Sequence, residues 1–140
     1  MLQRILIAHD GSDGAQKAFE AAVELAARLN LSLHLVSVEE DLPQYAQTMD
    51  EVSQEKEQED SYFGQLARQC TRRAALSGVA LESSIVAGHE VKSIVDFARQ
   101  GGFDLLVIGY TGHSRIYDHL WGGTSQNLAR MAPCSVLVVK

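Results

Sequence analysis

Short apolar runs recur along the chain and are separated by segments with helical periodicity. Residues 4–8, 104–108 and 135–139 each contain four successive apolar residues after a polar one, as expected of strands buried on both faces of a sheet. Residues 33–38 are a further predicted strand, and residues 79–86 alternate enough for a strand nearer a sheet edge. The pattern therefore predicts five strands.

Helical spacing lies between these strands. Ala18, Ala22, Leu25 and Leu29 recur at intervals of four, three and four, which places them on one face of a helix over residues 13–29. Helical periodicity or stop signals predict three further helices, at about residues 63–74, 91–98 and 124–132. Strands that alternate with helices predict one α/β domain over residues 1–140, with an open parallel sheet covered by helices on both faces.

The first turn and the segment after the second strand are polar. Asp10-Gly11-Ser12 follows the first strand as a turn, and Ser12 is a candidate N-cap for the helix that begins at residue 13. Residues 39–60 are strongly acidic and contain a proline. We interpret this segment as a loop that leads into a solvated helix start, with a partner-binding surface as the alternative.

Composition narrows the class of protein. The 140 residues carry a formal net charge of −6 without a basic stripe, which argues against nucleic-acid binding. Apolar runs are too short to span a membrane, and residues 1–8 lack the features of a signal peptide, so we expect a cytoplasmic protein. Cys70 and Cys134 lack metal-site spacing and lie in apolar contexts, which favours core thiols.

Two polar or glycine-rich loops follow the first and fourth strands. Asp10 lies in the first loop, and the second contains Gly109-Tyr110-Thr111-Gly112 and later Gly122-Gly123-Thr124-Ser125. Ligands of open α/β sheets bind at the carboxyl ends of strands where the strand order reverses. If these two strands are neighbours, both loops face one crevice.

The second loop has the chemistry of a phosphate site. Glycines allow close approach of backbone N–H groups to an anion, and a helix that starts at Thr124 would direct its positive end there. Thr124 and Ser125 add hydroxyl donors. The alternative is purely structural, with the glycines as turns and Thr124 as an N-cap, and spacing alone does not separate the two.

Other chemistry has less support. His113 and His119 flank Asp118, but their spacing is not that of a helical ligand pair, so we expect no metal site built by the protein. His9 and Ser12 lack an orienting third group, which argues against a nucleophile and base pair. A Walker-type phosphate loop is absent, and no lysine lies near the glycine loop, so ATP hydrolysis would be slow at most.

The glycine spacing resembles a known signature. Gly109, two residues, Gly112, nine residues and Gly122 match the pattern of ATP-binding universal stress proteins. Residues 5–12 are similar to the first strand and Asp-x-Ser turn of that family, and residues 132–139 to its last strand. The similarity covers essentially the whole chain.

The resemblance implies a Rossmann-like sheet of the adenine nucleotide α-hydrolase type with strand order 3-2-1-4-5. It also implies a site for ATP, AMP or ADP, with Mg²⁺ or Mn²⁺ held through the nucleotide phosphates. The family's roles fall on residues at the strand ends and in the glycine loop. These are Asp10 near ribose and phosphate, the main chain of Val38 at adenine, and Gly109, Gly112, Gly122, the Gly123 amide and Thr124 at ribose and phosphates.

One residue departs from the family pattern, and it leaves two functions open. Gly123 stands where the family has Ser or Thr, which removes one hydroxyl but keeps the backbone amide. The resemblance implies a homodimer through the apolar edge strand at residues 135–139 and a nucleotide-responsive role in stress response. The alternative is a dimeric interaction protein with an empty site. An enzyme of the wider adenine nucleotide α-hydrolase-like group is disfavoured, because Asp10-Gly11-Ser12-Asp13 is a poor match to the loop that those enzymes have after the first strand.

Overall fold

A parallel sheet forms the centre of the molecule. The structure is a computed structural model that describes residues 2–40, 61–110 and 123–140. Within these residues the sheet has five strands in the order β3-β2-β1-β4-β5, and all neighbours are parallel. The strands are β1 (Ile5–Ala8), β2 (Leu33–Glu39), β3 (Leu81–Ala87), β4 (Leu105–Gly109) and β5 (Ser135–Val139). The predicted strands and their order are confirmed.

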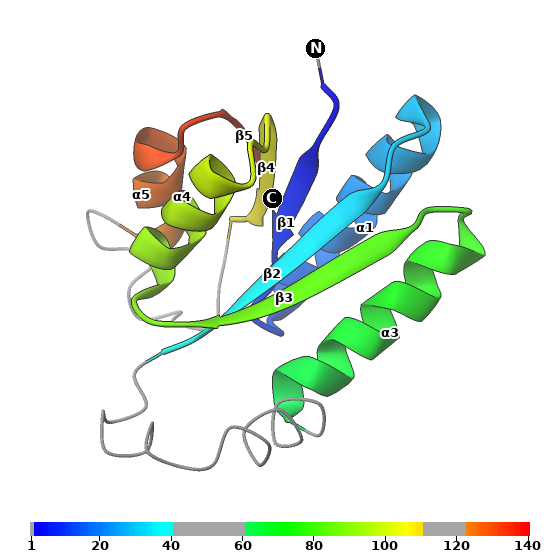
Figure 1. The fold of residues 1–140 in the computed structure, drawn as a ribbon, viewed down its shortest axis with the longest axis horizontal. Coiled ribbons are helices and arrows are strands. Elements are labelled where there is room, and N and C mark those ends of the chain that lie inside the picture. The colour runs from blue at the N-terminus through cyan, green and yellow to red at the C-terminus, as the bar shows by residue number, and fades with distance from the viewer. Residues whose placement is uncertain (1, 41–60, 111–122) are drawn as a thin grey trace.

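Helices cover both faces of the sheet, as predicted. Helices α1 and α3 lie on one face, and α4 and α5 lie on the other (Figure 1). Their bounds are α1 (Asp13–Leu29), α3 (Tyr62–Leu76), α4 (Glu90–Gln100) and α5 (Thr124–Met131). Among the described residues, none of the helices combines the length and the apolar character needed to cross a membrane.

Alternation along the strands divides the core into two layers. Ile5 and Ile7 of β1 pack against α1 and α3, whereas Leu6 packs against α4 and α5. Successive strand side chains point to opposite faces, so a strand buried on both faces must be apolar throughout. This explains why β1 is a continuous apolar run.

The third strand begins at Leu81 rather than at the predicted residue 79, although Gly78 ends the preceding helix as its sequence predicts. Gly78 has a φ of +73°, and its N–H donates to the Ala75 carbonyl at 2.9 Å. The Val79 N–H donates to the Ala74 carbonyl at 3.0 Å, and Val79 is buried. These contacts form a Schellman motif with its apolar contact, so Val79 belongs to the C-terminal cap of α3 and β3 begins at Leu81.

The two cysteines have different surroundings. Cys70 of α3 is buried in the core layer that also contains α1 residues, as predicted, and burial together with nearby Glu20 raises the pKa of its thiol to about 12. Cys134 is only half-buried, because it lies beside the edge strand β5, and burial raises the pKa of its thiol as well. Both thiols are free.

Candidate functional site

The predicted site residues at the strand ends share one edge of the sheet. Ile7 of β1 pairs with Leu35 of β2 and with Val107 of β4, so these parallel strands end on the same side of the sheet, with β2 extending beyond the end of β1. Asp10 follows β1, and the other two predicted residues, Val38 and Gly109, lie at or near the ends of β2 and β4. Gly112 and Gly122 lie outside the described residues, as do His113, Asp118 and His119.

The start of α5 lies at the same edge. The Ser125 hydroxyl donates to the Tyr110 carbonyl at 3.0 Å, which ties the first turn of α5 to the residue that follows β4. Tyr110 in turn donates its N–H to the Val139 carbonyl of β5 at 2.9 Å. The sequence alone suggests for Ser125 only the role of a hydroxyl donor to a ligand. In the structure its hydroxyl holds Gly123 and Thr124 next to the end of β4.

A glycine stands at the N-terminus of α5. Gly123 occupies the N-cap position with φ −56° and ψ 160°, and within residues 2–40, 61–110 and 123–140 no side-chain hydrogen bond caps the helix. No acidic residue lies in its first turn. A helix N-terminus carries the positive end of the helix dipole and N–H groups without intrahelical partners. As far as the described part of the chain goes, no side chain closes this end, whose N–H groups suit an anion, although Gly123 lacks the family's hydroxyl.

The turn after β1 is closely defined by hydrogen bonds. The Ser12 N–H donates to Asp10 Oδ1 at 2.9 Å, and the Ala15 N–H donates to Ser12 Oγ at 3.1 Å. The predicted N-cap at Ser12 is thus confirmed. Gly11 has a φ of +88°, and a Cβ at this position would collide with the phenol of Tyr62. The exposed Tyr62 ring can move away from a Cβ, so it is the positive φ that favours glycine at position 11.

His9 supports this turn from beneath. Its ring is buried, its Nδ1 accepts the Gly11 N–H at 3.0 Å, and its Nε2 lies 2.9 Å from Gln16 Oε1. An amide N–H only donates, so Nδ1 carries no proton and Nε2–H donates to Gln16. Burial lowers the pKa of His9, while Gln16 and the Asp10 carboxylate act in the opposite direction. The ring contacts Gly11 and Gln16 rather than Ser12.

The main chain of His9 is held as firmly as its ring. The His9 N–H donates to the Val36 carbonyl at 3.0 Å, and the buried Ser37 hydroxyl donates to the His9 carbonyl at 2.8 Å. Sequence reasoning did not find this supporting role. The available signal was a histidine directly after a buried strand, followed by a glutamine in the first turns of the next helix.

No protein-built metal site is found among the residues that the structure describes. A search of residues 2–40, 61–110 and 123–140 finds no group of three or more His, Cys, Asp or Glu side chains able to hold a metal ion. Among the described residues, this end of the sheet offers the Asp10 carboxylate, the N-terminus of α5 and backbone groups. This donor set is suited to a ligand with sugar hydroxyls and phosphate oxygens.

A profile of the universal stress protein family matches residues 1–140. The chain belongs to the universal stress protein family. It is similar to a universal stress protein of Bacillus subtilis, with 28% identity over 153 residues and complete coverage of both chains.

Two solved structures share the fold of this universal stress protein. The protein UspA of Lactobacillus plantarum is 29% identical with a TM-score of 0.82, over 99% of this chain and 98% of that one. A universal stress protein in complex with cAMP is 28% identical with a TM-score of 0.78, over 99% and 97% of the two chains. That second relative carries an adenine nucleotide.

Proposed function

We propose that this universal stress protein binds an adenine nucleotide at the carboxyl edge of its sheet and responds to it in a stress-response role. The observation that carries the proposal is the open N-terminus of α5, held by Ser125 beside the end of β4, on the same edge as Asp10. The likeness to a relative in complex with cAMP supports an adenine nucleotide as the ligand.

The roles follow from the donors at each place. The open end of α5, with the Gly123 amide and the Thr124 hydroxyl, is suited to phosphate oxygens. Asp10 follows β1 between the two neighbouring strands and can accept hydrogen bonds from ribose hydroxyls. The main chain at Val38 supplies the donor and acceptor that an adenine edge needs. For ATP, Mg²⁺ or Mn²⁺ would be held through the phosphates. Gly109 is the last residue of β4, the third strand that ends at the proposed site.

Calorimetric titration with Mg²⁺-ATP tests this proposal on the wild type and two variants of Thr124. Thr124→Glu places a carboxylate at the first helical position, where it favours α5 through the helix dipole but repels phosphate. Thr124→Gln has nearly the same shape without the charge. We expect saturable binding by the wild type, a loss of at least about tenfold for Thr124→Glu, and a smaller loss for Thr124→Gln.

Two results would reject the proposal. One is the absence of binding by nucleotide-free wild type at millimolar ATP. The other is equal affinity of Thr124→Glu and Thr124→Gln for the nucleotide, which would show that its phosphates do not bind at the N-terminus of α5. Circular dichroism and a denaturation midpoint verify that both variants are folded.

The edge strand supports a second proposal, that two copies pair through β5. Strand β5 forms one edge of the sheet, and Leu137 is 39% exposed on it. An apolar edge strand presents unpaired backbone groups and is normally covered. Such a dimer serves the nucleotide-responsive function and equally the alternative, an interaction protein with an empty site.

A further inference from the structure

The further inference concerns His9, a buried polar side chain that lies next to the proposed nucleotide site without facing solvent. Its side chain is only 2% exposed, and both ring nitrogens have partners. Burial of an imidazole ring is costly unless its polar atoms are satisfied. These hydrogen bonds therefore stabilise the turn formed by Asp10, Gly11 and Ser12.

We propose that His9 is a positioning residue for nucleotide binding: it accepts the Gly11 N–H and so holds the turn that carries Asp10 in its binding geometry. Gln16 fixes the required tautomer by accepting the Nε2 proton. This inference rests on the proposed function, because the turn is assigned to the nucleotide there. His9 contacts no ligand in this account and acts only through the turn.

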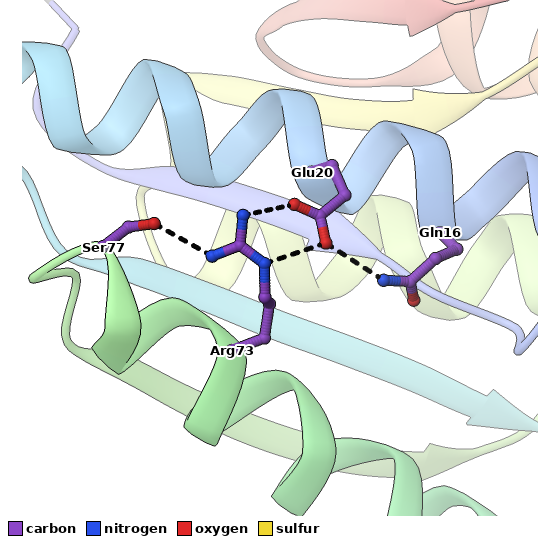
Figure 2. Close-up of polar contacts among 4 residues, drawn as sticks. All are labelled: Gln16, Glu20, Arg73 and Ser77. Carbon is purple, nitrogen blue, oxygen red and sulfur yellow. Dashed lines mark hydrogen bonds and ion pairs between the residues drawn. The ribbon is translucent and has the colours of Figure 1, made fainter.

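A chain of side-chain contacts anchors Gln16 in turn. Gln16 Nε2 donates to Glu20 Oε1 at 3.4 Å, and Glu20 is bound by Arg73 of α3 at 2.7 and 3.1 Å (Figure 2). Arg73 also donates to the Ser77 hydroxyl at 2.9 Å. The support for the turn therefore extends from β1 through α1 to the far end of α3.

Protonation of His9 would reverse its contact with the turn. A protonated Nδ1 is a donor, so it would face the Gly11 N–H with a second N–H. Asp10 is the charged group on the same segment, and its carboxylate favours the protonated ring. Helix α1 presents neutral Gln16 and the ring of Phe19, whose centroid is 6.0 Å from that of His9.

The other elements around His9 add no net charge through the contacts that the structure describes. Strand β2 contributes the Ser37 hydroxyl, which donates to the His9 carbonyl. From α3, the hydroxyl of Tyr62 lies 3.5 Å from the Gly11 carbonyl, and Arg73 is paired with Glu20. Affinity for nucleotide should therefore fall as the pH is lowered through the pKa of His9.

Cyclic AMP is the probe for this inference, because its phosphodiester keeps one constant charge between pH 5 and 8 and adds no titration of its own. Three variants separate the contacts. His9→Asn keeps an acceptor for the Gly11 N–H in an Asx-turn but removes the titration. His9→Phe keeps the ring volume beside Phe19 and removes both hydrogen bonds. Gln16→Glu replaces the neutral acceptor of Nε2 with a carboxylate.

We expect the dissociation constant of the wild type to rise on acidification, and that of His9→Asn to stay near the wild-type value at pH 8 and to vary little with pH. His9→Phe should bind about fivefold to a hundredfold more weakly at pH 8, since a partly buried N–H loses its acceptor. Gln16→Glu should move the midpoint of the pH profile to higher pH, because a carboxylate favours the protonated ring.

The two proposals fail in different ways. If the wild type does not bind cyclic AMP or ATP at any pH, the proposed nucleotide function fails. If the wild type binds but His9→Phe and His9→Asn share its affinity and its pH profile, the positioning role of His9 is overturned. Should His9→Phe not fold, the comparison of His9→Asn and Gln16→Glu with the wild type decides the matter through their pH profiles.

Discussion

Gly109 at the end of β4 lies directly against Gly14 in the first turn of α1. A Cβ on Gly109 would come within 2.6 Å of the Gly14 carbonyl carbon and oxygen. Both partners here are backbone, so the collision cannot be relieved by rotation of a side chain. The family signature assigns Gly109 to the nucleotide, whereas the structure gives it a packing role as well.

This contact predicts that Gly109→Ala destabilises the fold itself. We expect a loss of about 1–3 kcal/mol in the free energy of unfolding, the usual cost of overpacking a closely packed contact. Denaturant unfolding at a fixed pH measures it. A stability equal to that of the wild type would contradict the close approach. Because folding and binding are both affected, Gly109 is a poor position for a binding test, which is why Thr124 is preferred.

The ion pair between Arg73 and Glu20 should contribute measurably, since it is bidentate and joins two helices. Both side chains are about 40% exposed, so solvent screening limits the cost of Arg73→Met to about 0.5–1 kcal/mol. Arg28→Met is the matched control, because Arg28 pairs with Glu24 within one helix at greater exposure. Denaturant unfolding of both variants should show the larger loss for Arg73→Met, and the reverse order would contradict this account.

The two thiols should differ in reactivity. Cys70 is buried, with a pKa of about 12, so the reactive thiolate is scarce at neutral pH. Labelling with iodoacetamide at pH 7.5, read by mass spectrometry, should modify Cys134 first and Cys70 only after unfolding. Cys134→Ala should then be nearly unlabelled in its native state. Rapid labelling of native Cys134→Ala would show that Cys70 is accessible.

Stability should decrease on acidification through two histidines. Burial lowers the pKa of both His9 and His34 below the ordinary 6.5. The unfolded chain therefore takes up protons at a higher pH than the folded chain. The stability that these groups contribute is complete above about pH 6.5 and is lost as the pH falls toward their folded pKa values. Chemical denaturation at pH 7.5 and 5.5 measures this change.

The double variant His9→Asn, His34→Asn serves as the comparison for the pH dependence of stability. It should lose less unfolding free energy between the two pH values than the wild type, because neither asparagine titrates. An equal loss would assign the acid sensitivity to other groups.

The proposed pairing through β5 predicts that Leu137→Glu yields monomers, since a charge on the paired edge would be desolvated. Leu76→Glu is the control: Leu76 is 85% exposed at the end of α3, away from β5. Light scattering after gel filtration should give dimers for the wild type and for Leu76→Glu. A dimeric Leu137→Glu would place the interface elsewhere.

The sequence predicted most of the fold because the apolar runs of the strands report burial on both faces directly. The strand order came from the family resemblance, since periodicity does not encode which strands are neighbours. The start of β3 was placed two residues early because Val79 is apolar and buried, although its N–H belongs to the cap of α3.

The site was predictable only in outline. Asp10 and Thr124 could be named as candidates because polar residues at strand ends and helix starts have recognisable patterns. The contact of His9 with Gln16 and that of Gly109 with Gly14 depend on how α1 lies against the sheet. Such contacts between distant or differently oriented elements leave no periodic signal in the chain.

The most direct test of the nucleotide site is a titration of the ¹⁵N-labelled protein with Mg²⁺-ATP, observed through backbone amide chemical shifts. The account predicts saturable shifts at Asp10, Val38, Gly123 and Thr124. It predicts little change at Asn30, which caps the end of α1 near the amino ends of the strands. Shifts that cluster around Asn30 instead, or no shifts at millimolar nucleotide, would contradict binding at the carboxyl ends of the strands.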